Sequence, residues 1–124
     1  MILLDTSILI ELFRKKDKSN TLFYQIAQEK SELAISSITH YEVGIGNNRL
    51  HQDYWESLCE NLMVLPFDRI CSETATSVYR ELKSKNKLID LADLLIGATS
   101  LSHEIPIATL NKKHFERIPG LKIY

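Results

Sequence analysis

The sequence predicts an α/β protein in which a mainly parallel central sheet is flanked by helices. Short apolar runs that are typical of buried strands alternate with longer amphipathic segments along the 124 residues, and this alternation is characteristic of parallel sheets. Glycine and proline are scarce, at four and three residues, and no stretch has the composition of a linker. We therefore expect one domain that spans residues 1–124.

The first strand is predicted at 2–4, where three apolar residues follow one another without alternation. Such a run is typical of a strand that is buried on both faces. Asp5, Thr6 and Ser7 come next, and all three residue types favour a helix start. Asp5 is therefore expected where a parallel strand ends and a helix begins, which is the edge of an open α/β sheet at which ligands bind.

The remaining elements follow from apolar residues at helical or strand spacing. Helices are expected at 17–30, 36–45, 53–62, 68–84, 91–101 and 111–115, and strands at 33–35, 63–65, 107–109 and, at an edge, 121–123. Ser19 or Asn20 can cap the helix at 17–30, and Asp68 can cap the helix at 68–84. The helix at 91–101 is apolar nearly all round, so we expect it to be buried.

The composition argues against several classes of protein. The net charge is −1, so the chain lacks the strongly basic balance of many nucleic-acid-binding proteins. Its apolar runs are far shorter than the roughly 18 residues of a membrane span, and the N-terminus lacks the basic flank of a signal peptide. We therefore expect a cytoplasmic protein without membrane contact. Cys59 and Cys71 have no CxxC spacing and are expected to be reduced thiols.

The basic residues are clustered in spite of the near-neutral total. Three groups stand out: Arg14, Lys15, Lys16 and Lys18, then Lys83, Lys85 and Lys87, and finally Lys112, Lys113 and Arg117. Each group is either an ordinary solvated surface or, if it lies beside a set of carboxylates, a source of phosphate contacts. For RNA we single out four of these residues as candidate contacts, namely Arg14, Lys15, Lys112 and Lys113.

Acidic residues occur at positions where charge is unfavourable. Asp5 follows a buried strand, and Asp93 lies within the most apolar helix of the chain. Glu42 is expected to share the apolar face of its helix, since Ile38 and Ile45 lie four residues before it and three after it. A buried carboxylate is costly unless it is paired or binds a metal. Three residues before Asp93 stands another acid, Asp90, which is either a site acid or a helix cap.

Carboxylates that converge without Lys or Arg partners repel one another, and a divalent cation removes that repulsion. Oxygen ligands favour Mg²⁺ or Mn²⁺ over Zn²⁺. The four histidines show no zinc-binding spacing, so we expect them to be surface or capping residues. Walker, GxGxxG and GxSxG motifs are also missing from the sequence. A carboxylate cluster that holds Mg²⁺ is typical of phosphoryl transfer, in which a further carboxylate can orient the attacking water.

In these features the chain resembles the PIN-domain ribonucleases, and more narrowly the VapC-type toxins of bacterial toxin–antitoxin pairs. The resemblance covers the whole chain. Five segments carry it: 2–7, 36–42, 93–99, 109–115 and 118–121. Each segment alone is weak evidence for the family, but their order and spacing together are specific to it.

This resemblance implies a flavodoxin-like sheet, a homodimer and Mg²⁺-dependent RNA cleavage by water that leaves a 5′-phosphate. It also implies a small antitoxin partner that covers the active site. Asp5 and Asp93 would bind the metal, Glu42 would help to organise metal and water, and Asp90 would be an additional acid found in some members.

Supporting residues are implied in the same way. Thr6 and Ser37 match positions that hydrogen-bond the acids. A fourth family acid, where present, falls two residues after the strand-end Thr109. In this chain that position is Asn111, which is neutral and argues against a second tightly held metal.

Two other functions are alternatives to the nuclease. A receiver-like signalling domain also uses Mg²⁺ and Asp, but it needs an acidic pair after the first strand and a phospho-accepting Asp after the third. Here the first strand offers Asp5 alone, and Asp68 after the third strand is better explained as a helix cap. A catalytically inactive PIN binding module is the other reading, and the presence of all three main acids argues against it.

Overall fold

Four parallel strands form the central sheet, in the order β3-β2-β1-β4. The computed structural model describes residues 1–30, 32–47 and 49–124. Within them the strands are β1 (Ile2–Leu4), β2 (Leu33–Ser36), β3 (Met63–Leu65) and β4 (Ile107–Ala108). Every pairing is parallel, and β1 lies between β2 and β4. The predicted parallel sheet is confirmed, although the expected edge strand at 121–123 is reduced to one bridge, between Ile107 and Ile123.

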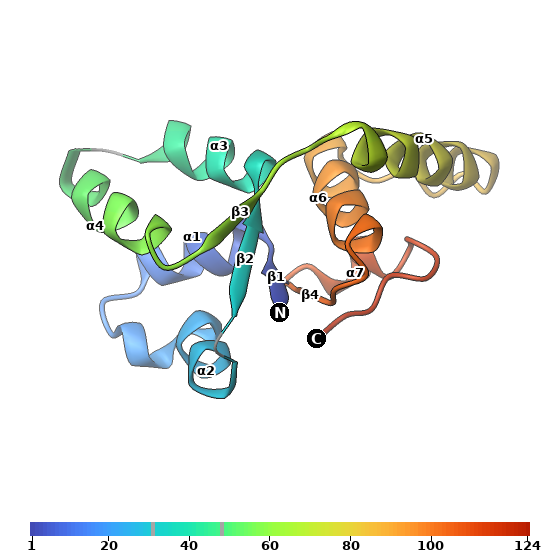
Figure 1. Cartoon of the computed structure of the whole chain (residues 1–124). Coiled ribbons are helices and arrows are strands. Elements are labelled where there is room, and N and C mark those ends of the chain that lie inside the picture. The colour runs from blue at the N-terminus through green and yellow to red at the C-terminus, as the bar shows by residue number, and fades with distance from the viewer. Residues whose placement is uncertain (31, 48) are drawn as a thin grey trace.

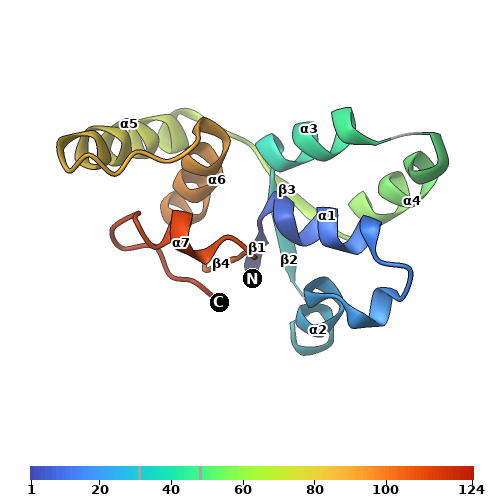
Figure 2. The same ribbon diagram turned by 180° about the vertical axis from the view of Figure 1, so that it is seen from behind.

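Helices cover both faces of this sheet (Figure 1, and from behind in Figure 2). One side carries α1 (Thr6–Arg14), α2 (Leu22–Glu29), α3 (Ser37–Gly46) and α4 (Arg49–Cys59). The other side carries α5 (Arg69–Ser84), α6 (Leu91–Ser102) and the single turn α7 (Lys112–Phe115). None of the helices in the described part of the chain is long and apolar enough to cross a membrane.

Each face of the sheet has its own hydrophobic core. Ile2 and Leu4 of β1 belong to the cluster under the first four helices, whereas Leu3 belongs to the cluster under the last three. The three side chains are at most 2% exposed. The unalternating apolar run therefore does mark a strand buried on both faces, as predicted. As a result, the residue that follows the run is held at the centre of the sheet edge.

Two predicted helices differ from the observed ones at their ends. The expected helix at 17–30 is divided into a 3₁₀ turn, Lys18–Asn20, and α2. The division falls at Thr21, because its side chain, rather than that of Ser19 or Asn20, accepts the capping hydrogen bond from the Tyr24 N–H. The helix expected at 53–62 begins at Arg49 and ends at Cys59, after which a turn buries Leu62 against the core.

The predicted burial of α6 is confirmed only for its central and C-terminal part. Residues 96–100 are buried, but Leu91 in the first turn is 69% exposed. Gly97 lies where the helix meets the segment after α7, since a Cβ there would collide with the Cδ1 of Ile118 and touch Phe115. The missing side chain thus allows Ile118, in the segment after α7, to pack closely against α6.

Asp68 is the N-cap of α5, as predicted, and its carboxylate accepts a hydrogen bond from the Cys71 N–H at 3.0 Å. This assignment removes the phospho-accepting Asp that a receiver-like domain would need after β3. The backbone hydrogen bond from Cys71 is also the main reason why the pKa of Asp68 lies below its usual value.

The Asp68 cap makes stability depend on pH in a defined direction. Because the folded-state pKa is depressed, the charge contributes stability above the unfolded-state pKa of about 3.9, and the contribution is lost as pH falls through the folded-state value. Asp68→Ala should therefore unfold at lower urea concentration than wild type at pH 7, and the gap should narrow as the pH falls below the unfolded-state value of about 3.9. Asp68→Asn, which keeps an acceptor oxygen, is the control. A gap of constant size across this range would contradict the account.

Candidate active site

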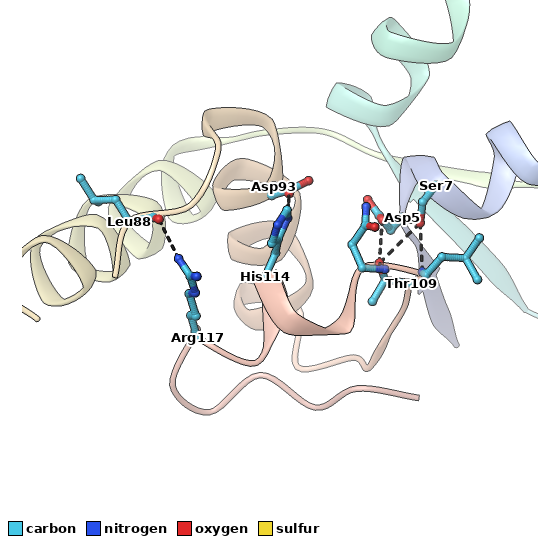
Figure 3. Close-up of polar contacts among 9 residues, drawn as sticks. Asp5, Ser7, Leu88, Asp93, Thr109, His114 and Arg117 are labelled. Carbon is cyan, nitrogen blue, oxygen red and sulfur yellow. Dashed lines mark hydrogen bonds and ion pairs between the residues drawn. The ribbon is translucent and has the colours of Figure 1, made fainter. Parts of the chain in front are cut away.

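Asp5 lies directly after β1 at the N-cap position of α1, but its carboxylate does not cap that helix. The residue is 1% exposed. Its Oδ2 accepts hydrogen bonds from the Ser7 hydroxyl at 2.7 Å and from the Thr109 hydroxyl at 2.8 Å (Figure 3). Thr109 follows β4, so the ends of two neighbouring strands meet at this carboxylate, as expected for a parallel sheet.

The two hydroxyls that hold Asp5 are themselves held by backbone N–H groups. The Ser7 oxygen accepts from the Leu110 N–H at 3.0 Å, and the Thr109 oxygen accepts from the Asn111 N–H at 2.9 Å. Each hydroxyl hydrogen is therefore directed at Oδ2 of Asp5. Among the described residues, the second carboxylate oxygen, Oδ1, receives no hydrogen bond, which leaves it for a ligand.

Glu42 projects from α3 toward the same strand edge. Its Oε1 accepts a hydrogen bond from the hydroxyl of Thr6 at 2.7 Å, and the Thr6 and Thr39 hydroxyl oxygens lie 3.0 Å apart. The reason given for Glu42 from the sequence was wrong, however. Ile45 is 68% exposed, and the buried residues of α3 are Thr39 and Val43. Glu42 is therefore at the border of the buried face, where its charge remains partly solvated.

Asp93 lies in the first turn of α6, half-buried, and its Oδ2 is 2.8 Å from Nδ1 of His114 on α7 (Figure 3). Burial raises the pKa of Asp93, and the charges of Asp5 and Asp90 raise it further, while the His114 hydrogen bond acts in the opposite direction. The negative charges of Asp5 and Asp90 thus act on the carboxyl group of Asp93, although Asp5 is far from it in the sequence.

Asp90 occupies the N-cap position of α6, but its side chain makes no capping hydrogen bond. The residue is exposed, and its charge adds to the field at Asp93. Asp90 is therefore the N-cap residue by its backbone position, but its carboxylate does not cap the helix. The carboxylate is available to a ligand.

The acids offer a partial set of metal ligands. Among residues 1–30, 32–47 and 49–124, no three acidic, histidine or cysteine side chains are close enough to form a ready-made cage. Within the same residues, no Lys or Arg forms an ion pair with any of the four acids of the site. Carboxylates that lack Lys and Arg partners and repel one another fit a hard divalent ion. Mg²⁺ in particular binds through one or two carboxylates and keeps several waters, so it does not need a complete cage.

The structure also shows which supporting residues meet the acids. Thr6 and Thr109 do, as expected. Ser37 does not, because its hydroxyl accepts from the Phe67 N–H at 3.2 Å and so ties α3 to the segment after β3. Asn111 is exposed, and in the described part of the chain its contact with the site is through its backbone N–H.

Three residues that contact this site were missed by sequence reasoning: Ser7, Thr39 and His114. Ser7 follows Asp5 by two residues, a spacing that could have suggested a hydrogen bond within the turn. His114 was expected to be a surface or capping histidine, and its side chain is indeed 44% exposed, but its contact with Asp93 was not expected. No spacing signal marks it, since it reaches Asp93 across 21 residues.

Two of the predicted RNA contacts, Arg14 and Lys15, lie near residues that support the site. They line a hollow of about 440 Å³ together with Ser7 and Asn111. The ammonium group of Lys15 donates to the backbone carbonyl of Asn20 at 2.8 Å, so part of its hydrogen-bonding capacity is already used.

The other two, Lys112 and Lys113, line a neighbouring hollow of about 580 Å³ with Thr109, Asn111 and His114. Asn111 belongs to both hollows. Lys112 and Lys113 therefore lie on the segment 109–114, which carries hydrogen-bond partners of Asp5 and Asp93, and Arg14 and Lys15 line the adjoining hollow. A polyanion could be held between the two basic pairs.

Known proteins resemble this chain in sequence and in fold. The family described as PIN domain matches residues 2–121. Ribonuclease VapC1 of Methanocaldococcus jannaschii is 37% identical, in an alignment covering 99% of this chain and 86% of the relative. VapBC2 of Rickettsia felis, solved bound to a DNA fragment from its promoter, has a similar fold, with a TM-score of 0.85, 26% identity and coverage of 100% and 98% of the two chains. A toxin–antitoxin complex from Klebsiella pneumoniae matches with a TM-score of 0.76, 28% identity and coverage of 98% and 95%.

Proposed function

Because the chain belongs to the PIN domain family, we propose that it is a metal-dependent endoribonuclease and the toxin of a type II toxin–antitoxin pair. The observation that carries the proposal is the pairing of two acids across the sheet edge. The buried carboxylate of Asp5 has only hydroxyl partners among the residues that the structure describes, and its charge raises the pKa of Asp93. Residues 1–124 would act as one catalytic unit in the cytoplasm.

Asp5 and Asp93 would hold the metal, which we take to be Mg²⁺, with Mn²⁺ as a substitute. A bound ion would neutralise the phosphate and lower the pKa of water. Ser7 and Thr109 keep Oδ2 of Asp5 occupied, so that Oδ1 is the oxygen presented to a ligand. The Thr6 hydroxyl likewise holds one oxygen of Glu42.

Glu42 and Asp90 have different roles in this proposal. The free oxygen of Glu42 can accept a proton from the attacking water. Asp90 is exposed, so it would act as an additional acid that reaches the ion through solvent. The water would attack the phosphorus atom while the bond from phosphorus to the 3′ oxygen breaks. The 3′ oxygen would take a proton from solvent, so that one fragment ends in a 3′-hydroxyl and the other carries a 5′-phosphate.

The partners follow from the same proposal. The substrate is RNA, and a cognate antitoxin covers the site, as the similarity to toxin–antitoxin complexes supports. We further propose that the chain forms a homodimer. With a net charge of −1, attraction of RNA depends on local basic residues rather than on the whole surface.

RNA cleavage by purified protein tests the site assignment. With Mg²⁺ and a structured RNA, Asp93→Asn and Glu42→Gln should each lose at least about 100-fold in rate, since even outer contacts of a metal site contribute 10–100-fold. Asp53→Asn removes an exposed acid from α4 and is the matched control. An Asp93→Asn protein that cut RNA as fast as wild type would show that the site is assigned wrongly.

The basic residues beside the site make a prediction about salt. The double variant Lys112→Ala, Lys113→Ala should bind RNA more weakly and should lower the slope of log K against log salt concentration by about 1.4, given about 0.7 per single-strand phosphate contact. The double variant Lys83→Ala, Lys87→Ala removes the same charge from the end of α5 and its loop, and serves as the control. Equal slopes for the two double variants would contradict the proposed RNA path.

A further inference from the structure

A histidine stands beside the acids although the sequence gives it no role. Nδ1 of His114 lies 2.8 Å from Oδ2 of Asp93, and Figure 3 shows the imidazole reaching from α7 to α6. Two other histidines are occupied elsewhere. The ring of His40 packs on Trp55, and Nδ1 of His103 lies 2.9 Å from the Thr99 carbonyl oxygen at the far end of α6.

The segment that carries His114 is anchored at both ends. At its start, the Thr109 hydroxyl donates to Asp5, and the Asn111 N–H donates to Thr109. At its end, Phe115 is fully buried beside Gly97 of α6, and Ile118 fills the space that the glycine leaves open. A single helical turn has little stability of its own, so these anchors determine where α7 lies. Residues 109–114 therefore connect the two acids proposed to bind metal.

We propose that His114 is a positioning residue of the metal site. Its Nδ1–H donates to Oδ2 of Asp93 and fixes that carboxylate, so that Oδ1 is presented to a divalent ion shared with Asp5. Thr109 performs the same task at Asp5, and one short segment thus sets the spacing of both ligands. The inference rests on the proposed function, because it concerns the same metal site.

The geometry separates this role from two others. If His114 acted on RNA, its Nε2 atom would be the working group, since Nδ1 is engaged by Asp93. If it served only to pack α7, the imidazole could be replaced by any side chain of similar size. A role in orienting Asp93 requires a hydrogen-bond donor at the position of Nδ1, and it requires no contact by Nε2. Asn places its amide nitrogen at the position of Nδ1, whereas Gln extends the nitrogen by one bond.

Mn²⁺ binding to the full chain without RNA provides the test, measured by calorimetry or by electron paramagnetic resonance. Wild type should bind the ion, His114→Ala should bind it about 10–100-fold more weakly, and His114→Asn should recover most of the affinity. His103→Ala removes the imidazole at the other end of α6 and should bind as wild type does. Thermal unfolding in EDTA checks that each variant folds, and His114→Gln replaces the Ala variant should that one be unstable.

Each outcome decides the question. Affinity that follows the order wild type, Asn, then Ala or Gln supports the positioning role. Equal affinity of the wild-type and Ala proteins, or an Asn variant as weak as Ala or Gln, overturns it and leaves the proposed function in place. A wild-type protein that binds no Mn²⁺ overturns the metal-dependent function itself, and this inference with it.

Discussion

Asp5→Asn is expected to abolish RNA cleavage and yet to raise the free energy of unfolding of the metal-free protein by about 1 kcal/mol. Both effects have the same origin. The carboxylate is 1% exposed and is held by hydroxyls, without a cationic partner in the described part of the chain. An Asn side chain keeps an oxygen that can accept from Ser7 and Thr109, but it removes the buried charge. Sites that bind charged ligands commonly carry such a cost in stability.

Urea denaturation in EDTA and a cleavage assay with Mg²⁺ measure these two effects separately. Asp53→Asn, which changes an exposed acid, should leave both quantities unchanged. The Asn variant at position 5 should also lower the pKa of Asp93, because the charge of Asp5 contributes to raising it. A less stable Asp5→Asn protein would mean that the carboxylate serves the fold rather than a ligand.

Thr109→Val is expected to lower the free energy of unfolding by about 1–3 kcal/mol. The substitution preserves the shape of a side chain that is 1% exposed, but it removes a hydroxyl that contacts the Asp5 carboxylate, the Asn111 N–H and, at 3.5 Å, the Ser7 hydroxyl. Oδ2 of Asp5 loses one donor, and the Asn111 N–H loses its acceptor. Cleavage should fall as well, because Asp5 is then free to leave its position at the sheet edge.

Thr109→Ser is the matched variant, since it keeps the hydroxyl and loses only a methyl group. It should cost no more than about 1.5 kcal/mol and should retain most of the activity. Thermal or urea unfolding together with the cleavage rate compares the pair. If Val and Ser destabilised the protein equally, the methyl group rather than the hydrogen bonds would explain the effect.

The position of Asp5 could be predicted because it depends on local sequence. A run of three apolar residues specifies a doubly buried strand, and parallel pairing then places the next residue at the sheet edge. The strands predicted at 2–4, 33–35 and 63–65 and the helix predicted at 68–84 follow from the same periodicities, and the structure agrees closely with them. The cap at Asp68 was equally local, since it depends on residues three apart.

The contacts around the acids could not be predicted in this way. Thr109 and His114 reach their partners across 104 and 21 residues, and such contacts depend on how the strands and α7 pack. Glu42 was identified for a wrong reason, because helical spacing alone does not say which stripe of α3 faces the core. The break at Thr21 shows the same limit, as several neighbouring residues are equally good caps and tertiary packing selects one of them.

The metal requirement of the wild-type protein tests the central claim most directly. Labelled RNA is incubated with the protein in Mg²⁺, in EDTA, and in EDTA followed by excess Mg²⁺, and the ends of the fragments are identified. We expect cleavage with Mg²⁺, none with EDTA, recovery when Mg²⁺ is restored, and fragments that carry a 5′-phosphate. Cleavage that persists in EDTA and leaves a 2′,3′-cyclic phosphate would contradict the account, because the RNA would then be cut by its own hydroxyl without the metal site around Asp5 and Asp93.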